Sequence, residues 1–229
     1  MTTTALIVGA GSGLSASLAR LFAAEGIKVA LAARRIDKLT ALSQDIGAIS
    51  FACDASKPDE VNQLFHDVEQ KLGAPTVVVY NPSLRIAASL IELDPIEVAK
   101  SLEITAYGGF LVAQAAAKRM LALGGGAIFL TGASASVKGY PRSAPFAMGK
   151  FALRGLAQSI ARELAPHNIH VAHFIIDGAI RSATRQEPDD KPDSLLDPDA
   201  IAQTYLNILR QPRNAWTWEV ELRPWVERF

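Results

Sequence analysis

The 229-residue sequence has little of what marks secreted, membrane or nucleic-acid-binding proteins. Cys53 is its only cysteine, so no internal disulfide can form and a cytoplasmic location is expected. The opening segment Met1-Thr2-Thr3-Thr4 has no basic residue, and the apolar run from Ala5 to Val8 is too short for a signal peptide or a membrane span. Lys and Arg total 23, as do Asp and Glu, so no net charge attracts a polyanion. We therefore expect neither a membrane nor a nucleic acid as a partner.

The composition is that of a folded protein with a sizeable core. Hydrophobic residues make up 49% of the chain and charged residues 20%, which argues against disorder. No internal repeat or long linker is visible, and the length suits one large α/β unit better than two nucleotide-binding ones. We expect a single domain over residues 1–229.

Apolar runs of strand length alternate with longer stretches of helical periodicity, which is the sequence form of repeated βαβ units. The predicted strands are Ala5–Val8, Lys28–Ala32, Ile49–Cys53, Thr76–Tyr80, Ala127–Leu130, Ile169–Ile175 and Thr217–Leu222. The predicted helices are Leu14–Glu25, Ile36–Ile46, Pro58–Leu72, Pro95–Leu123, Ala147–Leu164 and Asp199–Arg210. This order predicts the α/β class, with a doubly wound Rossmann-type parallel sheet of about seven strands and helices on both faces.

Two stretches carry predictions about surfaces. The helix over 147–164 is apolar on several faces, which favours packing against the sheet on one side and a second subunit on the other, in a homodimer or homotetramer. The segment Arg185–Pro198 holds three prolines and four aspartates with little apolar periodicity. It predicts a surface loop, and residues 179–198 are expected to form a substrate or lid loop.

Other signals point to packing rather than chemistry. His170 and His173 stand at odd separation on one predicted strand, so they point to opposite faces and cannot share a metal ion. Alternation at Trp216, Trp218 and Val220 predicts one face of an edge strand. With Trp225 and Phe229, these aromatic residues favour core or subunit packing over base stacking.

The first predicted strand runs directly into a glycine-rich turn and then a helix. Glycine permits positive φ and close approach of the backbone to a pyrophosphate, whose charge meets free amides and the positive end of the helix dipole. A tight turn without a ligand is the alternative, but the position after the first strand favours a nucleotide site. The turn residues predicted to bind the cofactor are Gly9, Gly11, Ser12, Gly13 and Leu14.

The residues at the end of the second predicted strand indicate which cofactor binds. An NAD site needs a carboxylate here for the ribose hydroxyls, but the sequence reads Ala33, Arg34 and Arg35. Guanidinium groups accept no hydrogen bond from a hydroxyl, whereas they can clamp a phosphate with charge-assisted hydrogen bonds. The pair predicts NADP(H) in preference to NAD(H), with two solvated arginines as the alternative.

From the glycine turn to about Gly178 the sequence resembles the short-chain dehydrogenase/reductase family. The family turn T-G-x-x-x-G-x-G is matched at Gly9 and Gly13, with Val8 for the opening Thr and Ser15 for the last Gly. The resemblance implies a small-molecule carbonyl or alcohol as substrate. It implies roles for Asp54 at the adenine, Asn81 in the segment after the fourth strand, Lys150 at the nicotinamide ribose, Ser134 at the substrate carbonyl, and Gly178 and Ile180 at the cofactor.

The same resemblance exposes departures at the reacting centre. Phe146 occupies the position of the family Tyr that donates a proton, and Phe has no titratable group. Thr105 falls at the family Asn that helps to hold a relay water. Asp177 stands where the family has Pro, and it is either an unusual proton carrier or a cap. Tyr140, Ser143 and water are other possible donors, but none has the spacing of the missing Tyr.

Two functions remain open from the sequence. The first is an NADP(H)-dependent oxidoreductase in which Ser134 orients the substrate oxygen, Lys150 holds the ribose, and the proton comes from water or an unidentified group. The second is a catalytically silent dinucleotide-binding sensor or scaffold, suggested by the departures at Thr105, Phe146 and Asp177. We favour the first.

Overall fold

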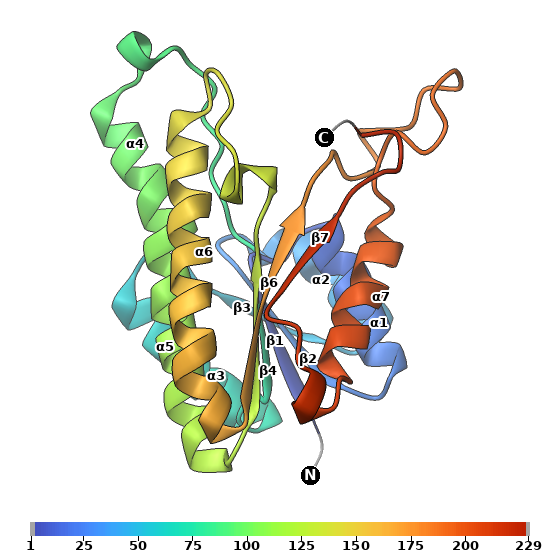
Figure 1. Ribbon diagram of the computed structural model, residues 1–229. Coiled ribbons are helices and arrows are strands. Elements are labelled where there is room, and N and C mark those ends of the chain that lie inside the picture. Colours follow the sequence, from blue (N-terminus) through green and yellow to red (C-terminus); the bar gives the residue numbers. More distant parts are fainter. Residues whose placement is uncertain (1–2, 228–229) are drawn as a thin grey trace.

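Seven strands form one parallel sheet in the order β3-β2-β1-β4-β5-β6-β7 (Figure 1). The computed structural model describes residues 3–227, so Met1, Thr2 and Phe229 lie outside the described residues. The strands are β1 Thr4–Val8, β2 Lys28–Ala33, β3 Ile49–Ala52, β4 Val77–Tyr80, β5 Gly126–Thr131, β6 Ile169–Ile176 and β7 Glu219–Leu222. The predicted doubly wound sheet is confirmed, with strand ends that differ by at most two residues.

Helices cover both faces of the sheet, as predicted. The α-helices are α1 Leu14–Ala24, α2 Thr40–Ile46, α3 Pro58–Leu72, α4 Pro95–Leu102, α5 Gly108–Leu123, α6 Ala144–Leu164 and α7 Pro198–Leu209. Short 3-10 helices span Ile36–Leu39, Leu90–Glu92, Ser134–Ser136, Ala165–His167 and Arg213–Ala215. Helices α3, α5 and α6 lie on one face, and α1, α2 and α7 on the other (Figure 1).

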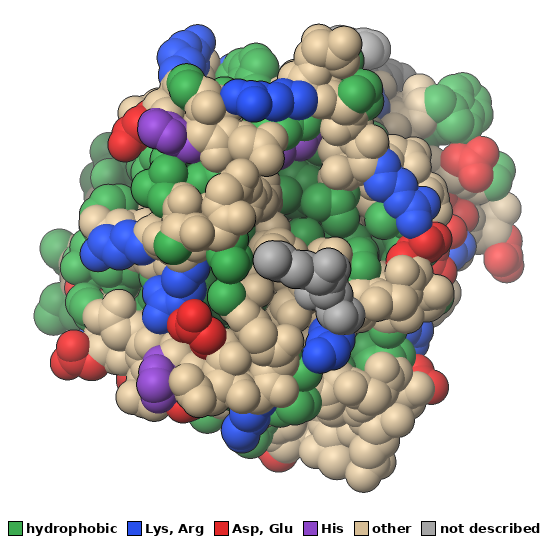
Figure 2. All heavy atoms as spheres, turned by 90° about the horizontal axis from the view of Figure 1, so that it is seen from below, with side chains coloured by type: hydrophobic (Ala, Val, Ile, Leu, Met, Phe, Trp, Pro, Cys, Tyr) green, Lys and Arg blue, Asp and Glu red, His purple; other side chains and the backbone are tan. Residues whose placement is uncertain are grey.

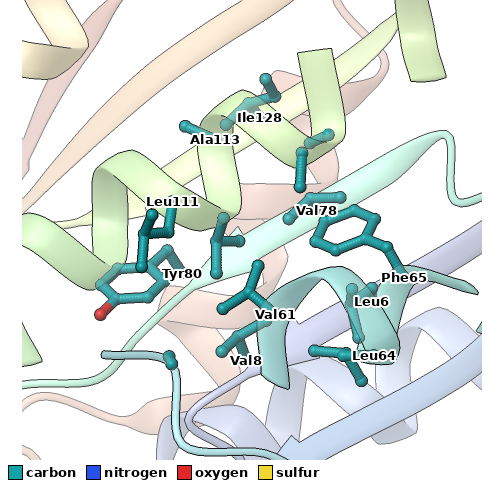
Figure 3. Close-up of a cluster of buried hydrophobic side chains, with 14 of the residues drawn as sticks. Leu6, Val8, Val61, Leu64, Phe65, Val78, Tyr80, Leu111, Ala113 and Ile128 are labelled. Carbon is teal, nitrogen blue, oxygen red and sulfur yellow. The ribbon is translucent and has the colours of Figure 1, made fainter. Parts of the chain in front are cut away.

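The five inner strands alternate their buried side chains between the two faces, which is why their sequences read as nearly continuous apolar runs. Leu6, Val78 and Ile128 point toward α3 and α5, where they meet Val61 and Phe65 (Figure 3). Their neighbours along the strands pack against α1 and α7 on the opposite face. Burial on both sides makes this sheet a rigid support for the loops at its carboxyl edge.

One predicted helix is interrupted. The stretch expected to be a single helix over 95–123 forms α4 and α5, joined by a π-helical turn over Glu103–Tyr107. Just after this turn, Gly108 passes so close to the sheet that a Cβ there would lie 2.4 Å from the Tyr80 hydroxyl and 2.8 Å from the Ala55 carbonyl oxygen. Close packing against β4 therefore accompanies the local widening of the helix.

The C-terminal aromatic residues depart from the predicted pattern. Trp216 stacks on His170 with ring centroids 4.6 Å apart, on the face covered by α7. Trp218 instead lies beside Arg154 of α6, on the other face. The prediction that Trp216, Trp218 and Val220 share one face was wrong, because regular β7 pairing begins only at Glu219 and the preceding chain does not alternate.

Strand order reverses between β1 and β4, whose connections run to opposite sides of the sheet. Such a switch point leaves a crevice at the carboxyl ends of the strands, where open α/β sheets bind ligands. The opposite face of the molecule, at the amino ends of the strands, carries basic and acidic side chains interspersed with one another (Figure 2). The fold thus directs attention to the carboxyl edge.

Candidate functional site

Two adjoining pockets lie along the carboxyl edge of the sheet. The first, about 460 Å³, is bounded by the glycine turn, the end of β2 and the residues after β3. The second, about 700 Å³, extends across the ends of β5 and β6 toward the loop after β6. Asn81 and Ser83, which follow β4, line both pockets. An extended ligand lying across the switch point would occupy the two together.

The glycine turn is held against the segment that follows β4. Gly9 has φ +81°, and a Cβ there would lie 2.7 Å from Pro82. Both the backbone conformation and the lack of space therefore require glycine at this position. Ser15, which replaces the last glycine of the family turn, is buried and donates to the Gly9 carbonyl oxygen at 3.1 Å. The Asn81 amide donates to the Ser15 hydroxyl at 2.8 Å. The altered turn is therefore stabilised by a side-chain bridge of its own.

The turn also fits a phosphate ligand. The amides of Gly9 and Ala10 donate to the Ala32 carbonyl oxygen, but those of residues 11–13 have no protein acceptor within the described part of the chain. These free amides precede the N-terminus of α1, where the helix dipole favours an anion. Gly9, Gly11 and Ser12 line the first pocket, and Gly13 and Leu14 line the second. A diphosphate could therefore be bound by main-chain groups of this turn.

Three cations gather where the first pocket meets the end of β2. Arg34 and Arg35 line it as the sequence suggested, and Lys38, which sequence reasoning missed, lines it beside them. Asp54 lines the same pocket and accepts hydrogen bonds from the Ser56 amide and hydroxyl. Burial alone would raise the pKa of the Asp54 carboxyl, but these hydrogen bonds and the charge of Arg34 hold it below its ordinary value.

The second pocket brings together most residues expected at the reacting centre. Ser134, Phe146 and Lys150 all line it, and the Lys150 ammonium lies 5.9 Å from the centroid of the Phe146 ring. Ser136, two residues further on, is fully buried and accepts a hydrogen bond from the Ala133 amide. The geometry therefore supports Ser134 as the serine that faces the pocket. Tyr140 and Ser143 contribute further hydroxyl groups to its wall.

Lys150 is buried beneath this pocket. Its ammonium donates to the Thr131 carbonyl oxygen at 2.6 Å, which fixes the side chain against the end of β5. Burial lowers the pKa of Lys150 to about 8. The group is thus still mostly protonated at neutral pH, and it provides a fixed positive charge and hydrogen-bond donors beside Phe146.

Three further residues considered in the sequence analysis follow β6. Gly178 and Ile180 line the second pocket, as does Asp177, which is paired with Lys138 at 3.5 Å and Arg223 at 3.4 Å. These ion pairs hold the Asp177 carboxylate against the pocket wall.

Thr105 lies apart from these residues. It is buried in the π-helical turn, where its hydroxyl accepts a hydrogen bond from the Leu84 amide at 3.3 Å, and a Cβ at Gly149 would lie 2.8 Å from it. It lines neither of the two pockets. This position therefore packs α6 against the turn rather than facing the cleft.

A charged network that the sequence did not reveal lies beneath the second pocket. Arg154 of α6 makes a bidentate pair with Glu219 of β7, at 2.6 and 2.8 Å. Glu219 is also 3.0 Å from Nδ1 of His173, a fully buried residue on β6. A Cβ at Gly132 would lie 2.3 Å from Nε2 of the same ring. The network therefore supports the start of the loop that carries Ser134.

We predict that this network makes stability depend on pH. Burial lowers the pKa of His173 to about 4, against the opposing effect of Glu219. Because the unfolded chain binds a proton near pH 6.5 and the folded one does not, the contribution of His173 is complete above pH 6.5 and falls as the pH drops toward 4. Between pH 7 and pH 5 the free energy of unfolding should fall by about 2 kcal/mol, measured by urea unfolding.

The matched control is His173→Gln, which keeps an N–H donor for Glu219 but does not titrate in this range. This variant should lose much less stability over the same pH interval. A pH dependence equal to that of the wild type would show that other groups are responsible.

A parallel sheet with a glycine turn at its switch point, free amides at a helix N-terminus and a cleft across the strand ends defines a dinucleotide-binding Rossmann-type protein. The family model for short chain dehydrogenases matches residues 3–193. The chain therefore belongs to the short-chain dehydrogenase/reductase family, and this membership supports an NAD(P)-dependent oxidoreductase.

Individual relatives agree with this assignment. Carbonyl reductase family member 4 of Xenopus laevis is 28% identical over 222 residues, covering 93% of each chain. A crystal structure of a short-chain dehydrogenase from Rhodopseudomonas palustris is 37% identical, with a TM-score of 0.84 over 97% of this chain and 99% of that one. A metagenomic short-chain oxidoreductase in complex with NADP is 27% identical, with a TM-score of 0.85 over 97% of both.

Residues 3–227 lack two kinds of feature. No helix there is both long and apolar enough to cross a membrane. In the same range, no three His, Cys, Asp or Glu side chains are grouped to hold a metal ion. His170 and His173 lie on opposite faces of β6, as predicted.

Proposed function

We propose that the protein is an NADP(H)-dependent oxidoreductase that transfers hydride to or from a small carbonyl or alcohol. The observation that carries this proposal is the pair of adjoining pockets, with a phosphate-binding turn and an arginine pair at one end and Ser134 with Lys150 at the other. Arg34 and Arg35 would contact the 2'-phosphate, and Asp54 the adenine. The NADP complex of the metagenomic relative is consistent with this choice of cofactor.

The chain's own side chains would then prepare the reaction at the second pocket. A bound nicotinamide supplies or accepts the hydride. Lys150, fixed on Thr131, would hold the adjacent ribose, with Gly178 and Ile180 bounding that end of the cofactor. Ser134 would donate a hydrogen bond to the substrate oxygen. Because Phe146 cannot transfer a proton, the proton would move between that oxygen and water or a hydroxyl group of the pocket wall.

Cofactor titration followed by a substrate screen tests the proposal. Purified protein is titrated with NADPH and NADH by calorimetry, and a panel of aldehydes and ketones is then screened for oxidation of bound NADPH. We expect tighter binding of NADPH and slow but measurable turnover. Saturating NADPH without any heat or thermal shift would overturn the cofactor site. Binding without turnover would instead favour the silent sensor or scaffold suggested by Phe146.

We also propose that the protein is a homodimer or homotetramer with α5 and α6 at the interface. Phe110, Met148 and Phe151, with Tyr107 just before α5, are large apolar side chains left exposed on these neighbouring elements. Tyr107 and Phe110 stack on one another at 6.2 Å between ring centroids. Burial of such a surface by a second copy would be favourable. Size-exclusion chromatography with light scattering should give a mass two or four times that of the chain.

The remaining assignments follow from the same fold. We propose a single domain over residues 1–229, in which residues 179–198 act as a lid over the second pocket. Its two ends are joined by main-chain hydrogen bonds, from the Arg181 amide to the Leu196 carbonyl oxygen and from the Leu196 amide to the Ala179 carbonyl oxygen. The segment between them is therefore a closed loop. A cytoplasmic location agrees with Cys53, which is buried as a free thiol.

A further inference from the structure

The second pocket carries more positive charge than the binding of an uncharged carbonyl compound requires. Four basic residues line it, namely Arg85, Lys150, Arg181 and Arg185, against two acidic ones, Asp177 and Glu227. Asp177 is neutralised by two cations of its own, and Arg181 is paired with Asp197 at 2.8 Å. What remains around the pocket is an excess of positive charge, contributed by Arg85, Arg185 and Lys150 against Glu227.

Arg85 is the best placed of these cations. It follows β4 by five residues, and its guanidinium lies 5.8 Å from the centroid of the Phe146 ring. Within residues 3–227, no carboxylate lies within 4.0 Å of this guanidinium, so no ion pair competes for its charge. A guanidinium over an aromatic face keeps its N–H groups free for a second, planar partner.

Arg185 lines the same pocket from the loop after β6. Ser182 and Arg185 pair as a tight antiparallel bridge, with hydrogen bonds of 2.9 and 3.1 Å between their main chains. Both residues line the pocket, and Arg185 too has no ion pair among the described residues. The two arginines thus approach the same cavity from the segment after β4 and from the loop after β6.

Phe146 gives this arrangement a physical reason. Its ring lies near two cations, Arg85 at 5.8 Å and Lys150 at 5.9 Å. The negative face of an aromatic ring stabilises a neighbouring cation without neutralising it. The residue that removes the usual proton donor therefore also helps to hold positive charge at the substrate end of the cleft.

We infer that the substrate is an anion, a carbonyl or hydroxy compound that carries a carboxylate, and that Arg85 binds this carboxylate with Arg185 assisting from the loop. A carboxylate matches the planar donors of a guanidinium, and both partners gain charge-assisted hydrogen bonds. The inference rests on the proposed function for its chemistry, in which the hydride adds to the keto carbon and a proton to its oxygen. It concerns residues separate from the predicted phosphate clamp.

Matched acids and esters test this inference by binding, without need of turnover. Acetoacetate and benzoylformate are titrated by calorimetry against protein saturated with NADP⁺ and against protein alone, beside methyl acetoacetate and methyl benzoylformate, at fixed ionic strength in a buffer free of phosphate and carboxylate. We expect at least one acid to bind about tenfold more tightly than its ester. Arg85→Gln should abolish that difference and leave the Kd for NADPH within about twofold.

Arg162→Gln is the matched control, because it removes the same charge from the exposed last turn of α6. It should retain the preference for the acid. Equal binding of acid and ester, no binding of either acid, or a preference that survives Arg85→Gln would each overturn the inference. Failure of NADPH to bind would contradict the proposed function instead, while an Arg85-dependent preference in the protein alone would still stand.

Discussion

Phe146→Tyr should raise kcat for carbonyl reduction by about 100- to 10,000-fold, the range that a positioned general acid contributes. The variant places a phenol beside the ammonium of Lys150, which lies 5.9 Å from the centroid of the existing ring. Burial keeps that lysine in place, and the pocket of about 700 Å³ gives the new hydroxyl access to substrate. A nearby cation lowers the pKa of a phenol and so makes it a better acid.

Rates of NADPH oxidation by the wild type and the variant, with the same carbonyl panel, measure the effect. The Kd for NADPH should stay within about twofold, because the phosphate-binding turn is untouched. Phe151→Tyr is the control, since it adds a hydroxyl one residue beyond Lys150 on the same helix, at the proposed subunit interface and outside the second pocket. If Phe146→Tyr leaves kcat unchanged or lowers it, another group already delivers the proton.

The sequence predicted the sheet well because buried parallel strands have a recognisable local sequence pattern. Each inner strand is a short, mostly apolar run with two covered faces, followed by a turn or a helix start. It failed at the junction of α4 and α5, where the residues remain helix-forming and the widening of the helix accompanies close packing against Tyr80. The misplacement of Trp218 has the same origin, since alternation predicts a face only where strand pairing is regular.

In the candidate site, too, the sequence indicated some positions and not others. The positions of the glycine turn and of Arg34 at the carboxyl edge were predictable, because they follow from the local order of a strand, a turn and a helix. Arg85 and the group of Arg154, His173 and Glu219 were not, because their partners lie far away in the sequence. Glycine patterns and helical spacing carry no information about such contacts, which depend on how β4, β6, β7 and α6 meet in space.

Arg34→Ala should weaken NADPH by about 10- to 100-fold, corresponding to about 1.5–3 kcal/mol for hydrogen bonds between charged groups, and weaken NADH by less than about threefold. Arg34 directly follows β2 and lines the first pocket together with Asp54. Its charge is available for a 2'-phosphate, which NADH lacks. Calorimetric titration with both cofactors at two salt concentrations measures the effect, and the wild-type preference should shrink as salt screens the pair.

Lys28→Ala provides the comparison, because it removes a cation from the opposite end of β2, away from the carboxyl edge. It should leave both Kd values unchanged. Arg35 and Lys38 share the same pocket wall, so a residual preference for NADPH in Arg34→Ala should disappear when Arg35→Ala is added. Equal losses for NADPH and NADH in Arg34→Ala would mean that the side chain contacts the shared part of the dinucleotide, and the phosphate clamp would have to be abandoned.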